Sequence, residues 1–165
     1  MNFMKKKISL NENLELLFEM DQKIFTREFD SKFESMEQVE SYYYGSEIYL
    51  FYSENTCAGI LAYKHTNYGS NPKKNESIDK SIRKNSVNLV KLAVLPEFQG
   101  RGLGSQMLEY FKETNSKKDL FLTTHPRNRG GVITYLKSGF EIYGWIDNFE
   151  MTGEPRLKLR LLRTR

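Results

Sequence analysis

The chain has 165 residues and a formal net charge of +4, with 25 basic side chains against 21 acidic ones. This length fits one domain, and so mixed a charge does not by itself indicate a nucleic-acid partner. No apolar run reaches the roughly 18 residues that cross a bilayer, and residues 1–7 are basic without a following secretory apolar region. We therefore expect a cytoplasmic protein with no membrane partner. The single cysteine excludes an intramolecular disulfide, and with only two histidines beside it we expect no bound metal.

The first part of the chain predicts a strand, two helices and a hairpin. Residues 6–10 form a short strand, and Asn11 or Asn13 caps a helix that carries apolar residues at helical spacing as far as Ile24. Residues 35–44 form a second helix, which opens with a capping box at Ser35 and Gln38. Residues 47–52 and 57–64 then form a β-hairpin.

Residues 66–86 are polar and basic, and we expect a mobile insertion between two strands. They contain few apolar residues, so they bury little surface. A sharper hypothesis makes this insertion a basic flap over an acidic acceptor. Its bases outnumber its acids, with Lys73, Lys74, Lys80, Arg83 and Lys84 against Glu76 and Asp79.

The second part of the chain alternates strands and helices. Residues 87–95 read as a largely buried strand that Pro96 ends, and a helical pattern begins at Leu103. A strand at 120–124 and a helix from about Arg129 follow, and Gly139 stops that helix. Residues 140–146 and 156–161 form the last strands, the final one with one buried and one solvated face. The order indicates a single α/β domain over residues 1–165.

A glycine-rich turn, residues 99–104, lies between the buried strand and the helix that starts at Leu103. The first N–H groups of a helix lack intrahelical acceptors and carry the positive end of the helix dipole, so they attract phosphate. A Walker loop would need a lysine that is missing here. A dinucleotide fingerprint would need an acid after the next strand, whereas Asp119 precedes that strand.

Two segments carry a resemblance to a known family. Gln99, Gly102 and Gly104 give Q-x-x-G-x-G, which resembles the acetyl-CoA pyrophosphate loop of the GNAT N-acetyltransferases. Residues 128–140 resemble that family's N-x-x-A-x-x-x-Y-x-x-x-G-F pattern, with Gly131 where alanine is usual. Spacing supports the comparison, because Asn128, Gly131 and Tyr135 form one stripe on the predicted helix.

The resemblance implies a GNAT-type fold, with a mixed, mostly antiparallel central sheet flanked by helices. It also implies direct attack of a primary amine on the thioester of acetyl-CoA, the co-substrate. Tyr135 would protonate the departing thiolate, and Asn128 would hydrogen-bond the pantetheine arm. The remaining cofactor contacts would come from the strand and the turn, namely Leu92, Ala93, Val94, Gln99, Gly100, Arg101, Gly102, Leu103, Gly104 and Ser105.

The general base is left unassigned by the sequence. Some GNAT enzymes carry a glutamate early in the cofactor strand, where this chain has Asn88. Five acids are candidates: Glu28, Glu34, Glu47, Asp147 and Glu150. A water chain or an amine that is already neutral would serve as well. Cys57, His65 and His125 read as structural or loop residues, and three aromatic residues, Tyr143, Trp145 and Phe149, are candidates for lining an acceptor pocket.

Three classes of function follow from these features. The first is an N-acetyltransferase acting on a small amine, an amino acid or a peptide. The second is a noncatalytic acyl-CoA sensor, which would not need Tyr135. The third is a nucleic-acid-binding domain that uses the basic insertion and the arginines at 160, 163 and 165, but no concentrated basic helix supports it. The sequence leaves a homodimer open.

Overall fold

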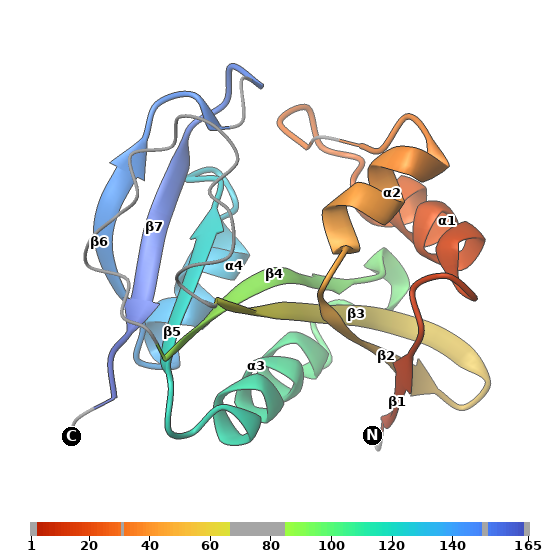
Figure 1. Cartoon of the computed structure of the whole chain (residues 1–165), viewed down its shortest axis with the longest axis horizontal. Coiled ribbons are helices and arrows are strands. Elements are labelled where there is room, and N and C mark those ends of the chain that lie inside the picture. The colour runs from red at the N-terminus through yellow and green to blue at the C-terminus, as the bar shows by residue number, and fades with distance from the viewer. Residues whose placement is uncertain (1–2, 31, 67–84, 150–151, 164–165) are drawn as a thin grey trace.

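We describe the protein from a computed structural model, which covers residues 3–30, 32–66, 85–149 and 152–163 (Figure 1). In these residues seven strands form one mixed sheet of order β1-β2-β3-β4-β5-β7-β6. The strands are β1 (Met4–Ile8), β2 (Glu47–Ser53), β3 (Thr56–Thr66), β4 (Ser86–Val94), β5 (Asp119–Thr124), β6 (Glu141–Ile146) and β7 (Arg156–Leu161). Only the β4–β5 pair is parallel within this sheet, so the predicted mixed, mostly antiparallel sheet is confirmed.

In the described part of the chain, four α-helices cover the two faces of the sheet: α1 (Leu14–Ile24), α2 (Met36–Tyr43), α3 (Leu103–Thr114) and α4 (Arg129–Lys137). Figure 1 shows α1 and α2 on one side of β3 and β4 and α3 on the other. The apolar spacing of the helices explains this arrangement. Leu17 and Val39 pack with the β2–β3 residues of one core, whereas Met107 and Phe111 pack with Tyr63 and Leu120 in the other. Apolar side chains therefore fill both interfaces.

The predicted elements all occur, with shifted ends. The first strand lies at Met4–Ile8 rather than at 6–10, while the final strand has the predicted bounds. Ser35 caps α2 as the capping box predicts, since its hydroxyl accepts the Gln38 N–H at 3.4 Å. Gly139 has the left-handed φ of 92° expected of a helix stop. None of the described helices is long and apolar enough to cross a membrane.

The predicted insertion begins and ends on strand residues, because Thr66 pairs with Ser86 at the end of the β3–β4 ladder. Residues 67–84, and with them the flap hypothesis, lie outside the described residues.

Strand β4 contains one extra residue relative to β3. Ala62 pairs with Lys91 and Tyr63 pairs with Leu89, so Val90 is a bulge. The carbonyl of Val90 accepts a hydrogen bond from the Tyr42 hydroxyl of α2 at 2.6 Å. Helix α2 is thereby fastened to the middle of β4, next to the point where the sheet opens.

Candidate active site at the split between two strands

A cleft opens where the parallel strands β4 and β5 separate. In the described residues these strands pair at Ser86, Val87 and Asn88 of β4 and not beyond. Both strands continue past this point and line one cavity of about 850 Å³. The rest of its lining comes from the α1–α2, β5–α4 and β6–β7 connections, from α2, and from Lys64 of β3, Tyr135 of α4 and Arg156 of β7. The split therefore leaves backbone groups of a central strand exposed to a ligand, which is unusual in a sheet.

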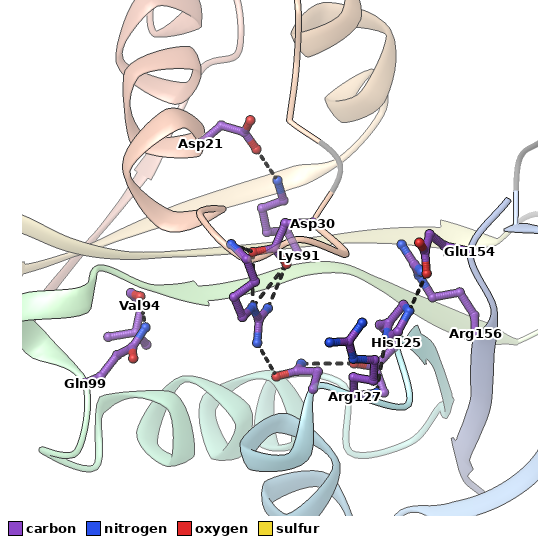
Figure 2. A network of polar contacts seen from close by, with 12 residues as sticks. Asp21, Asp30, Lys91, Val94, Gln99, His125, Arg127, Glu154 and Arg156 are labelled. Atoms are coloured by element: carbon purple, nitrogen blue, oxygen red, sulfur yellow. Dashed lines mark hydrogen bonds and ion pairs between the residues drawn. The ribbon is translucent and has the colours of Figure 1, made fainter. Parts of the chain in front are cut away.

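The predicted cofactor segment of β4 lies along this split. Ala93 is paired with Ile60, and the N–H of Leu95 donates to Ala58 in β3 at 2.9 Å. Because backbone groups alternate in direction along a strand, those of Leu92 and Val94 point to the side from which β5 has departed. The Val94 carbonyl accepts the side-chain amide of Gln99 at 3.1 Å, as Figure 2 shows. The backbone groups of Leu92 and Val94 are thus turned away from β3, whereas those of Ala93 face it. Leu92 lines the cleft, and Val94 and the turn at 99–105 lie outside its lining.

The glycine-rich turn leads directly into α3. Gly100 and Gly102 have φ values of 74° and 79°, which residues with a Cβ rarely adopt, and Gly102 is the N-cap. The first hydrogen bond of the helix joins the Gln106 N–H to the Gly102 carbonyl, so the N–H groups at 103–105 precede it. The backbone N–H of Gln99 already donates to Pro96 at 3.2 Å. The Gln99 N–H is therefore already engaged, and the N–H groups at 103–105 have no acceptor within the helix.

The stripe predicted on α4 is present, but Asn128 folds back over it. A Cβ at Gly131 would lie 2.4 Å from Asn128 Nδ2, so the missing side chain makes room for this amide. Asn128 Nδ2 donates to Thr124 Oγ1 at 3.1 Å, and its Oδ1 accepts from Arg27 Nη1 at 3.0 Å. The amide expected to contact pantetheine thus already joins β5, α4 and the α1–α2 connection.

Tyr135 lies in the wall of the cleft, with 7% of its surface exposed. Its ring packs edge-on against Phe140, and its hydroxyl has no hydrogen-bond partner among the described residues. Burial raises the pKa of Tyr135 to about 12, because the phenolate is poorly solvated there. The phenol is therefore protonated at neutral pH and its hydroxyl is available to a ligand in the cleft.

Three loops meet over one end of the cleft (Figure 2). Phe29 of the α1–α2 connection stacks on His125 of the β5–α4 connection, with ring centroids 4.3 Å apart. His125 Nε2 lies 2.7 Å from a carboxylate oxygen of Glu154 in the β6–β7 connection, and His125 Nδ1 accepts the Arg127 N–H at 3.0 Å. These contacts hold the loops together around the side chains that line the cleft.

A family model described as an acetyltransferase (GNAT) domain matches residues 45–142. The chain belongs to the GNAT acetyltransferase family. Its match covers β2 to the start of β6 and includes both the glycine-rich turn and the Asn128–Tyr135 stripe. No curated protein matches the chain.

Solved structures share the fold of this GNAT acetyltransferase. The ribosomal-protein-S18-alanine N-acetyltransferase of Escherichia coli is 15% identical with a TM-score of 0.73, covering 97% of this chain and 93% of its own. Arabidopsis thaliana Naa50, in complex with the bisubstrate analogue CoA-Ac-MVNAL, is 20% identical with a TM-score of 0.73 and coverages of 98% and 99%. A spermidine N-acetyltransferase chimera from Vibrio cholerae and hSSAT is 14% identical, with a TM-score of 0.72 and coverages of 98% and 96%. These likenesses establish a common fold.

The candidate general bases that the structure describes are not residues of the cleft lining of this GNAT acetyltransferase. Glu28, Glu34, Glu47 and Asp147 are all absent from it, and Glu150 lies outside the described residues. Glu47, for example, accepts the hydroxyl of Tyr63 at 3.0 Å. Among the described residues, no three His, Cys, Asp or Glu side chains are grouped so that they could hold a metal ion.

The structure brings other residues to the cleft that sequence reasoning missed. Asp30 and Glu37 are the acids in its lining, and Arg27 lies beside Asp30. Of the three aromatic candidates for an acceptor pocket, Phe149 lines the cleft. Trp145 is instead 52% exposed and donates to Asp147. No local pattern marks Arg27 or Asp30, because each reaches the site through a loop whose path depends on the rest of the fold.

Proposed function

We propose that this acetyltransferase moves the acetyl group of acetyl-CoA to a primary amine by direct attack. The observation that carries the proposal is the split between β4 and β5. It leaves the outward backbone edge of β4 at Leu92 and Val94 without a strand partner, in the strand that leads to the start of α3, and Leu92 shares the cleft with the Tyr135 phenol. A long ligand with a phosphate-rich end, an amide-containing arm and a reactive sulfur matches these three features.

The chain's own groups would hold acetyl-CoA as follows. The N–H groups at 100–105 bind the pyrophosphate, with Arg101 adding a charge-assisted contact. Leu92 and Val94 present N–H groups, and Leu92 also a carbonyl, to the amides of pantetheine. Asn128 is a further donor and acceptor beside this arm, provided that one of its present partners yields. When bound, acetyl-CoA supplies the activated acyl group.

Tyr135 would act as the general acid. The amine nitrogen forms a bond to the acetyl carbon, the carbon–sulfur bond breaks, and the phenol gives its proton to the sulfur. The proton that the nitrogen loses as it becomes an amide passes to water, and the phenolate takes a proton back from water to restore Tyr135. A pKa of about 12 makes the phenol a weak acid against a free thiol at about 8.5. The same burial disfavours the thiolate, however, and raises its affinity for the proton. The transfer therefore stays feasible as sulfur gains charge in the desolvated cleft.

Thiol release from acetyl-CoA, measured with a panel of amines, amino acids, polyamines and peptides, tests this function. We expect release with at least one acceptor, and Tyr135→Phe should lower kcat by about 10- to 1,000-fold with the acetyl-CoA Kd largely kept. A chain that binds acetyl-CoA yet releases no thiol would contradict the proposal.

Tyr43→Phe is the matched control. Tyr43 is fully buried, lies outside the cleft lining, and its hydroxyl has no partner among the described residues. Removal of this hydroxyl should leave turnover unchanged. If Tyr135→Phe also left turnover unchanged, Tyr135 would lose its role as the acid.

A further inference from the structure

Arg27 is held rigidly at the wall of the cleft. Its Nε lies 3.1 and 3.2 Å from the two carboxylate oxygens of Asp30, and its Nη2 lies 2.9 Å from Oδ1. Its Nη1 donates to Asn128 Oδ1 at 3.0 Å, and its guanidinium lies over the Phe29 ring at 4.6 Å. These contacts fix the plane of the guanidinium before any acceptor arrives.

The guanidinium retains unused donors. It has five N–H groups, of which one on Nε, one on Nη1 and one on Nη2 are engaged by Asp30 and Asn128. One N–H on each terminal nitrogen has no partner among the described residues, and 45% of the side chain is exposed. These two N–H groups are donors that the oxygens of a carboxylate can accept.

The charges around the cleft favour an anionic group there. The lining contains five bases, Arg27, Lys32, Lys64, Lys91 and Arg156, against two acids, Asp30 and Glu37. Asp30 is already bound to Arg27, and the ammonium of Lys91 is bound to Asp21 at 3.1 Å. A polycationic acceptor would thus meet a lining of like charge, with Glu37 as its one acid that has no ion pair among the described residues.

We propose that Arg27 binds the carboxylate of the acceptor, and that the acceptor is an amino acid. The inference rests on the proposed acetyl transfer and specifies its substrate class. Arg27, Asn128 and Tyr135 all line the same cleft, and Arg27 contacts Asn128 at the N-terminal end of α4. A carboxylate bound to Arg27 and an amine directed at the thioester beside Tyr135 would then belong to one acceptor in that cleft.

Matched acceptor sets test this assignment. Each set contains an amino acid, its carboxamide and the corresponding decarboxylated amine, for example phenylalanine, phenylalaninamide and phenethylamine. Thiol release should give the best amino acid a kcat/KM at least about 10-fold above those of its two analogues. Arg27→Gln should raise KM for the amino acid by about 10- to 100-fold, the scale of hydrogen bonds to a charged group, and change kcat little. KM for the decarboxylated amine should not change.

Two variants and one binding measurement control the experiment. Arg27→Lys keeps the charge without the paired donors and should give an intermediate KM. Arg160→Gln removes an arginine that pairs with Glu141 outside the cleft lining and should change nothing. The acetyl-CoA Kd, measured by calorimetry, shows whether Arg27 acts on the donor instead.

The outcomes separate the two proposals. If the carboxamide or the decarboxylated amine is acetylated as well as the amino acid, the carboxylate site is refuted and acetyl transfer stands. An unchanged KM in Arg27→Gln refutes it too. Arg27→Gln could instead raise the acetyl-CoA Kd and lower kcat/KM equally for all acceptors. That result would show that Arg27 acts by holding Asn128, and it would overturn the inference. Absence of thiol release with every acceptor refutes the proposed function and the amino-acid site with it.

Discussion

Alanine substitutions at Gly130 and Gly131 can be compared to measure how much the hydrogen bonds of Asn128 contribute to stability. A Cβ at Gly130 would meet nothing within 4 Å, whereas one at Gly131 would lie 2.4 Å from Asn128 Nδ2. Both glycines are in the first turn of α4, so alanine gains helix propensity at each, up to about 1 kcal/mol. Only Gly131→Ala must also displace the amide from Thr124 and Arg27.

The expected difference follows from those two hydrogen bonds. At about 1 kcal/mol net for each, Gly131→Ala should be about 2 kcal/mol less stable than Gly130→Ala. In a chain of this size 1 kcal/mol corresponds to about 2–4 °C, so the two melting temperatures should differ by about 4–8 °C. Gly130→Ala itself should melt about 2–4 °C above the wild type, or slightly less.

Differential scanning calorimetry gives the melting temperatures of both variants, alone and combined with Asn128→Ala. The combined variants show whether the difference depends on the Asn128 side chain. Without the Asn128 side chain there is nothing to displace, and the two alanine substitutions should have equal effects. Equal melting temperatures in the presence of Asn128 would show that its amide moves aside freely, and would refute the account of why glycine occupies position 131.

Three further predictions concern ionisable and buried groups. Asp21→Asn should lower the free energy of unfolding by about 3–5 kcal/mol, because it leaves Lys91 buried without its partner. The double variant with Lys91→Met should recover most of this loss. Additive losses in denaturant titrations would refute the pairing. The cost of removing the Lys91 ammonium from water outweighs its attraction to Asp21, so burial lowers the pKa of Lys91 to about 8. In the unfolded chain the lysine keeps its proton to about pH 10.4. Between about pH 8 and 10 the unfolded state then binds more protons than the folded state. The free energy of unfolding of the wild type should therefore rise over this range relative to that of Lys91→Met, and equal pH dependence in the two proteins would argue against a lowered pKa of Lys91. The ultraviolet titration lost in Tyr135→Phe should have its midpoint near pH 12, and a midpoint near 10 would contradict the burial of this phenol.

The features predicted correctly from sequence depend on local chemistry. Gly139 ends α4 because a left-handed residue is required there, and Ser35 caps α2 through a bond three residues away. The glycine-rich turn is likewise a local device, since its left-handed residues and its helix start lie within a few positions. Such patterns can be read before the chain is folded.

The features that sequence reasoning missed depend on contacts between distant segments. Arg27 and Asn128 are separated by 101 positions, and no sequence pattern near either residue predicts their contact. The bulge at Val90 is visible only in its register against β3, because an extra residue leaves no mark in a strand's composition. The general base stayed unassigned for the same reason, since any surface glutamate is an equal candidate until the loops are placed.

Asn128 connects the proposed donor and acceptor sites. Its carbonyl oxygen accepts from Arg27, and its N–H donates to Thr124 on β5, the strand that borders the split. If pantetheine takes one of these bonds, Arg27 gains a third unused donor or Thr124 loses its partner. Acceptor and acetyl-CoA would then affect each other's affinity through one side chain, and thermodynamic linkage requires that the effect be equal in both directions. Gly131 permits this arrangement, because any side chain at that position would meet the amide that both sites share.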